Sequence, residues 1–149
     1  QQDGLVTLEG RVLAFPRLRG NTLDRVVRFE GRERARAAAA RGRGVLFFSG
    51  HFGHWELGAY LHGGSDLPLA LVTRPLDNPR LDRFLSRFRL AAGQRILPKR
   101  GSAWQVQDVL DGNGTLGVLG DQAAGWKGCR VEFFNRTAYC HKAIAVFAP

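Results

Sequence analysis

The sequence has only two cysteines, three lysines and no long apolar run. Two cysteines in 149 residues exclude a small domain stapled by disulfides, so a hydrophobic core must hold the fold together. The longest apolar stretches, such as Val45–Phe48 and Ala143–Ala148, are far shorter than the roughly 18 residues of a membrane-spanning helix. We therefore expect no transmembrane segment within this chain.

The length and the apolar content suit one folded domain. With 149 residues and 44% hydrophobic residues, the chain can bury a sizeable core. It opens on Gln1 and stops at Pro149 directly after an apolar run. We therefore expect residues 1–149 to be a single domain that is truncated at both ends and belongs to a longer protein.

The charge is strongly positive and is carried almost entirely by arginine. There are 22 Lys and Arg residues against 13 Asp and Glu, and the only lysines are Lys99, Lys127 and Lys142. Arginine has a planar guanidinium fork that suits phosphate and carboxylate groups. The surface therefore favours anionic partners, which include nucleic acid, anionic lipid and an acidic carrier protein. A GC-rich genome would produce the same bias, so composition alone does not choose among these.

Short apolar runs alternate with amphipathic segments along the chain. Asn78 and Pro79 are typical of a helix N-cap and first turn, and Ser102 with Gln105 predicts a capping box. We expect helices over Gly4–Phe15, Arg32–Arg41 and Phe52–Leu61, from Asn78 to Gly93, from Ser102 to Leu110, and from Thr137 onward. We expect strands at Val45–Phe48, Leu67–Val72, Arg95–Leu97, Thr115–Leu119 and Val131–Phe134, the first of them buried on both faces. This order predicts an α/β fold with a mostly parallel central sheet flanked by helices.

Ligand sites in parallel sheets gather beyond the carboxyl ends of the strands. His51, Arg74 and Asp121 each follow an expected strand. Glu56 follows His51 by five residues, a spacing at which the two side chains can meet if His51 lies in a turn and Glu56 on the first turn of a helix. A histidine held by a carboxylate is fixed in one tautomer and is a better base, although such a pair can also be purely structural.

Other chemistries have less support around His51. A nucleophile elbow needs Gly two positions before Ser49, where Phe47 stands. The four histidines and two cysteines lack metal-ligand spacing, so we expect no metal. No expected strand is followed by a phosphate-binding glycine loop.

The segment from His51 to Glu56, His-Phe-Gly-His-Trp-Glu, resembles the H-x4-[DE] motif of glycerolipid-type acyltransferases. More narrowly, it resembles the HFGNWE block of the bacterial lipid A biosynthesis acyltransferases, the lauroyl and myristoyl transferases. Further blocks resemble that family in the same order, and the resemblance covers about residues 27–149. They are Thr73–Pro79, Ser86–Arg89, Lys99–Gly101, Gly120–Gln122 and Glu132–Arg136.

This resemblance implies a fold, a reaction and a set of site residues. The fold would be glycerolipid-acyltransferase-like. His51 would be the general base and Glu56 would orient it, while the acceptor hydroxyl attacks an acyl carrier protein thioester without any cofactor. Arg89, with Arg74 or Arg87, would hold phosphate or polarise the oxyanion, and Asp121 and Gln122 would complete the polar wall of the site. Each of these side chains also has a structural reading, as an ion pair, a loop cap or a solvated helix face.

The resemblance also implies a location and a set of partners. The protein would act at the cytoplasmic face of the bacterial inner membrane, held by an N-terminal anchor missing from this chain. Its partners would be acyl carrier protein or coenzyme A as donor carrier, a lipid A precursor as acceptor, and the anionic membrane surface, without nucleic acid. Departures at His54, at Asn135 and over Tyr139–His141 affect the expected acceptor and chain length more than the reaction.

Two rival functions stay open at this stage. The first is an acyltransferase that modifies another acceptor, such as a lysophospholipid or a glycosylated phosphoinositide. The second is a non-catalytic basic module that binds anionic membrane or nucleic acid. That module would bind with a steep salt dependence and would not need His51.

Overall fold

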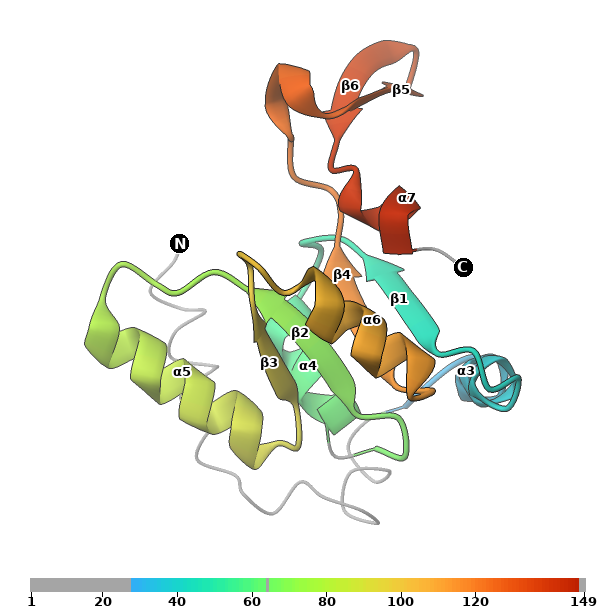
Figure 1. Cartoon of the computed structure of the whole chain (residues 1–149), viewed down its shortest axis with the longest axis vertical. Coiled ribbons are helices and arrows are strands. Elements are labelled where there is room, and N and C mark those ends of the chain that lie inside the picture. The colour runs from blue at the N-terminus through green and yellow to red at the C-terminus, as the bar shows by residue number, and fades with distance from the viewer. Residues whose placement is uncertain (1–27, 64, 148–149) are drawn as a thin grey trace.

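The computed structural model describes residues 28–63 and 65–147, and the helix expected over Gly4–Phe15 lies outside them. A four-stranded parallel sheet forms the centre of the described chain (Figure 1). Its strands are β1 (Val45–Ser49), β2 (Leu69–Thr73), β3 (Arg95–Pro98) and β4 (Thr115–Leu119), arranged in the order β1-β4-β2-β3. The predicted α/β class with a parallel central sheet is confirmed.

Helices cover both faces of this sheet. Figure 1 shows α6 (Ala103–Asp111) in front of the strands and α4 (Trp55–Gly63) behind them. The other α-helices of residues 28–147 are α3 (Arg32–Ala39), α5 (Pro79–Ala91) and the short α7 (Ala143–Phe147). None of the helices in the described part of the chain is long and apolar enough to cross a bilayer.

Two groups of buried side chains hold these layers together. On the α6 face, Val106, Val109 and Leu110 pack against strand residues Leu97 and Leu116. On the opposite face, α4 packs against α5, where Tyr60 and Phe88 stack with ring centroids 4.4 Å apart. The first group joins α6 to the sheet, and the second joins α4 to α5, which positions the side chains of these two helices that are described below.

The helix starts follow the sequence signals at α5 but not at α6. The side chain of Asn78 accepts hydrogen bonds from the backbone N–H groups of Arg80 and Leu81, as its N-cap role requires. The hydroxyl of Ser102 makes no capping hydrogen bond, so the predicted capping box is wrong. At α4, Nδ1 of His54 accepts the N–H of Leu57 at 3.2 Å, and the helix therefore starts three residues later than expected from Phe52.

Strand β1 is less buried than its apolar sequence suggests. The expectation was a strand covered on both faces, but β1 lies at the edge of the sheet and Phe48 is 61% exposed. An edge strand has a neighbour on one side only, so its side chains are less covered than those of a central strand. An apolar sequence does not show whether its strand will lie at the edge or in the centre, because it does not specify the strand order.

The largest departure from the predicted elements lies after β4. A single strand at Val131–Phe134 and a helix from Thr137 were expected, but the chain forms an antiparallel hairpin of β5 (Cys129–Phe133) and β6 (Arg136–Cys140). Phe134 and Asn135 connect the strands with φ of 49° and 58°, the backbone of a two-residue turn of the type that favours Asn. The helix begins only at Ala143.

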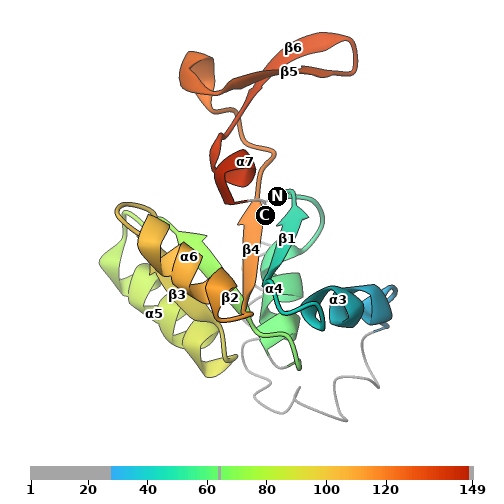
Figure 2. The ribbon, with the colours of Figure 1, turned by 45° about the vertical axis from the view of Figure 1, so that its right-hand side comes forward.

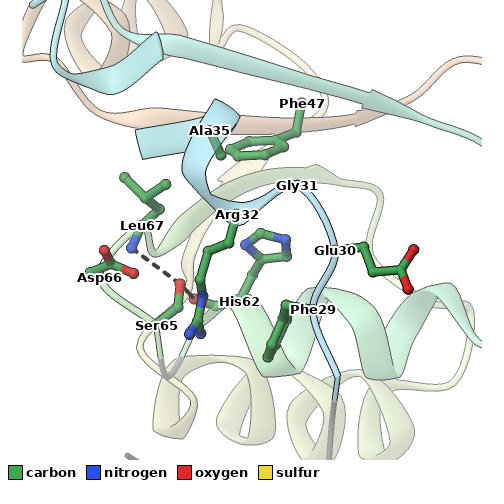
Figure 3. Close-up of a pocket in the computed structure, with 10 residues that line it drawn as sticks. All are labelled: Phe29, Glu30, Gly31, Arg32, Ala35, Phe47, His62, Ser65, Asp66 and Leu67. Atoms are coloured by element: carbon green, nitrogen blue, oxygen red, sulfur yellow. Dashed lines mark hydrogen bonds between the residues drawn. The ribbon is translucent and has the colours of Figure 1, made fainter. Parts of the chain in front are cut away.

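A hollow between α3 and the end of α4 is lined by aromatic side chains (Figure 3). The ring of His62 lies 5.1 Å from that of Phe47 and 6.3 Å from that of Phe29, measured between centroids. Burial lowers the pKa of His62, and the nearby Arg32 guanidinium lowers this pKa further, while Asp66 acts weakly in the opposite direction. None of the site residues predicted from the sequence lines this hollow.

The depressed pKa of His62 predicts a loss of stability in mild acid. Below the ordinary histidine pKa of 6.5 the unfolded chain binds a proton that folded His62 does not yet bind. The free energy of unfolding should therefore fall as the pH drops through and below this value, and should level off below the depressed pKa. Urea unfolding between pH 5 and 8 measures how the free energy of unfolding depends on pH.

Two histidine variants test this assignment. His62→Gln should flatten the dependence of the free energy of unfolding on pH, whereas His141→Gln, at an exposed position after β6, should not. An unchanged slope in His62→Gln would contradict the assignment.

Candidate active site

Neighbouring strands β1 and β4 bring His51 and Asp121 together. The two strands run parallel with Ser49 opposite Leu119, and the N–H of Gly120 donates to the carbonyl of Ser49 at 2.9 Å. His51 and Asp121 each stand two residues beyond these partners, at the carboxyl edge of the sheet. The sheet register therefore places an imidazole beside a carboxylate although 70 residues separate them in sequence.

The contact between these side chains is double. Nδ1 of His51 lies 2.7 Å from Oδ1 of Asp121, and the backbone N–H of His51 donates to Oδ2 of Asp121 at 2.7 Å. The side-chain hydrogen bond from His51, followed by the backbone one, lowers the pKa of Asp121 below its usual value. A charged Asp121 carboxylate accepts a hydrogen bond, so Nδ1 of His51 is the nitrogen that carries the proton. In the neutral imidazole the lone pair is then on Nε2.

Nε2 of His51 is suited to act as a base. The His51 side chain is 31% exposed, which leaves it accessible to a ligand. The indole of Trp55 lies edge-on to the imidazole, with ring centroids 5.2 Å apart, and supports its orientation. A histidine fixed by a carboxylate on one nitrogen and open on the other is the usual arrangement of a general base.

Glu56 has a different partner from the one expected. Its carboxylate accepts two hydrogen bonds from Arg89, from Nε at 2.7 Å and from Nη2 at 2.8 Å. The pairing of His51 with Glu56 inferred from their spacing is therefore replaced by His51–Asp121 and Glu56–Arg89. The reason is that Glu56 lies on the first turn of α4 and is buried against α5, whereas Asp121 arrives directly at the His51 loop from β4.

The Glu56–Arg89 pair joins α4 to α5. The side chains are 11% and 14% exposed, respectively, and their geometry is that of a bidentate Arg–carboxylate pair. This contact occupies two of the three guanidinium nitrogens of Arg89. Arg89 is thus a largely buried partner of Glu56, rather than the surface cation on α5 that its sequence position suggested.

The other predicted binding residues lie on the surface. Arg74 follows β2, is 72% exposed and contacts Asp77 through Nη2 at 3.1 Å. Arg87 on α5 and Gln122 beside Asp121 are also exposed. The structure therefore brings His51, Asp121 and Gln122 to one loop cluster, and Arg74 follows the strand next to β4 at the same edge of the sheet.

Sequence reasoning included Asp121 but missed its contact with His51. One local signal was present, because Gly50 allows the close approach of the two loops. A Cβ atom added at Gly50 would lie 3.1 Å from Oδ2 of Asp121, the oxygen that accepts the N–H of His51. This glycine keeps room for the carboxylate that holds the imidazole.

Gly50→Ala is therefore expected to impair catalysis more than stability. The added methyl should displace the Asp121 carboxylate by a few tenths of an ångström and weaken both hydrogen bonds to His51. We expect the turnover number to fall by about 10-fold, because small misplacements of catalytic groups are costly. Steady-state kinetics and thermal unfolding check this result.

Gly53→Ala is the control for this variant. Nothing lies within 4 Å of a Cβ atom added at Gly53, although the φ of 60° adds some backbone strain. Equal turnover in Gly50→Ala and the parent protein would contradict the role of this glycine.

The sequence of the chain matches a known protein family over nearly its whole length. Residues 9–149 match the family model described as bacterial lipid A biosynthesis acyltransferase, and no curated protein matches the chain. The match spans nearly the whole chain, including the β1 and β4 loops that carry His51 and Asp121. The chain belongs to the bacterial lipid A biosynthesis acyltransferase family, and it is an acyltransferase.

Proposed function

We propose that the protein transfers a fatty acyl chain from an acyl carrier protein thioester to a hydroxyl of a lipid A precursor. The observation that carries this proposal is the contact of His51 with Asp121, which holds Nδ1 and leaves Nε2 as the ring nitrogen available to a substrate hydroxyl. Membership of the family supports an acyl donor and a lipid acceptor. The excess of cations supports an acidic carrier protein as the donor.

In the proposed mechanism, His51 is the general base. Nε2 takes the proton from the acceptor hydroxyl while the hydroxyl oxygen attacks the thioester carbonyl. The charge of Asp121 stabilises the imidazolium that forms. The tetrahedral intermediate then expels the carrier thiolate, which takes the proton from the imidazolium. This path forms no covalent bond to the enzyme and uses no cofactor.

The positive side chains of the site have separate roles in this proposal. Arg74 and Arg87 are exposed and can bind acceptor phosphates, and Gln122 adds a polar group beside Asp121. Glu56 holds Arg89, so Arg89 is assigned to positioning rather than to phosphate. We place the reaction at the cytoplasmic face of the inner membrane, where both substrates are available.

The test is a transfer assay with matched donors and acceptors. Radiolabelled acyl groups are offered as acyl carrier protein or coenzyme A thioesters to the protein in membranes, with a phosphorylated lipid A precursor or a lysophospholipid as acceptor. The proposal predicts transfer to the lipid A precursor and faster transfer from the carrier protein. Transfer to the lysophospholipid alone would reject the acceptor, and preference for coenzyme A would reject the donor.

A further inference from the structure

The β5–β6 hairpin projects away from the central sheet (Figures 1 and 2). It begins shortly after Asp121, with the one-turn helix η2 (Gly125–Lys127) leading into β5. The carboxyl end of β4 therefore carries both the candidate base pair and the root of the hairpin. A surface that binds the hairpin would lie on the same side of the molecule as the site.

The hairpin and the η2 turn that precedes it expose large aromatic side chains. Phe133 is 65% exposed, Phe134 is 86% exposed and Trp126 is 81% exposed. The two phenylalanine rings contact each other edge-on at the turn, with centroids 4.6 Å apart, and make a convex apolar tip. Exposed aromatic groups of this size usually mark a binding surface.

Cations lie among these aromatic residues. Residues 125–140 contain Lys127, Arg130 and Arg136 against a single acid, Glu132. The ammonium group of Lys127 lies 5.3 Å from the centre of the Trp126 ring. A convex apolar tip flanked by cations matches the surface of an anionic bilayer, where aromatic rings enter the interface and cations contact headgroups. A protein partner would instead have to supply a pocket for the two rings.

We propose that the β5–β6 hairpin, with its aromatic tip Phe133 and Phe134, enters the interfacial region of an anionic membrane. This inference rests on the proposed function to the extent that it places His51 close to a lipid acceptor. Cross-strand hydrogen bonds satisfy the inner backbone groups of the hairpin. The outer edges stay in contact with water and headgroups, so only the tip goes deep.

The membrane contact is tested through the fluorescence of a tryptophan placed at the tip, in the variant Phe134→Trp. The protein is mixed with vesicles of phosphatidylcholine containing 30 mol% phosphatidylglycerol, with or without brominated acyl chains. The signal from the tip is the difference between Phe134→Trp and the parent protein, which separates it from the native tryptophans and from any anchor. We expect a blue shift and at least a twofold quenching. An unquenched tryptophan at position 134 overturns the proposal.

Two sets of variants separate the apolar and ionic contributions. Phe133→Ser with Phe134→Ser should weaken binding to vesicles about 10-fold or more, because it removes two apolar anchors. Phe84→Ser is the matched control, since Phe84 is 52% exposed on α5 away from the hairpin. Arg130→Gln with Arg136→Gln should weaken binding to anionic vesicles but not to pure phosphatidylcholine. Equal vesicle binding in all variants overturns the proposal.

The outcome for the hairpin is independent of the outcome for catalysis. Vesicle quenching without any acyl transfer would reject the proposed function and leave the membrane contact in place. Transfer to a detergent-dispersed acceptor that persists in the Phe133 and Phe134 variant, together with loss of vesicle binding, is the expected pattern. A fluorescence response of Phe134→Trp to acyl carrier protein but not to vesicles would identify a protein docking surface and overturn the membrane proposal.

Discussion

Replacing His51 with Ala is expected to lower the rate of acyl transfer by about 10²–10⁴-fold. The loss arises because His51 is the group that Asp121 holds in position to accept the hydroxyl proton. His51 is partly exposed and lies outside the two buried clusters, so its removal should change the free energy of unfolding by less than about 1 kcal/mol. Single-turnover kinetics with radiolabelled donor measure the rate.

A histidine elsewhere in the chain provides the control for this variant. His141→Ala changes an exposed position beyond β6 and should leave the transfer rate unchanged. Circular dichroism should show the same secondary structure and melting curve for both variants. If folded His51→Ala retained more than about half of the parent rate, another group would have to be the base.

Removing one member of the Glu56–Arg89 pair is expected to destabilise the fold by about 3–5 kcal/mol. In Glu56→Ala, the buried guanidinium of Arg89 loses both hydrogen-bond acceptors, and Arg89→Ala leaves the carboxylate unpaired. Both side chains are less than 15% exposed, so water replaces little of the lost contact. Urea unfolding measures each free energy, with Arg74→Ala, at an exposed ion pair, as the control.

The double variant Glu56→Leu, Arg89→Met distinguishes a lost pair from a general packing defect. Replacing both charges with apolar groups removes the unpaired ion, so this variant should be more stable than either single variant. Additive losses across the double-mutant cycle would show that the two side chains do not act as a pair. The cycle therefore tests the contact that replaced the predicted His51–Glu56 pairing.

Local signals in the sequence predicted most of the elements. Asn78 followed by Pro79 located the start of α5, and short apolar segments located the four parallel strands. These signals involve neighbouring residues, so a single sequence contains them. The alternation of strands and helices then determined the fold class.

Contacts between distant segments were not available from these patterns. The partner of His51 depends on β1 lying beside β4, and no residue in either strand specifies that neighbour. The short spacing to Glu56 therefore appeared more informative than the distant Asp121. The β5–β6 hairpin was not predicted because its turn, Phe134-Asn135, lacks the glycine that usually marks a two-residue turn.

The most direct test of the account compares Asp121→Asn with Glu56→Gln in the transfer assay. Both variants are measured at a temperature at which circular dichroism shows them fully folded. The account predicts that Asp121→Asn lowers the turnover number by about 10²–10⁴-fold, because the amide no longer stabilises the imidazolium or the required tautomer. Glu56→Gln should retain most of the turnover. Full activity in Asp121→Asn with a large loss in Glu56→Gln would contradict the account and restore Glu56 as the partner of His51.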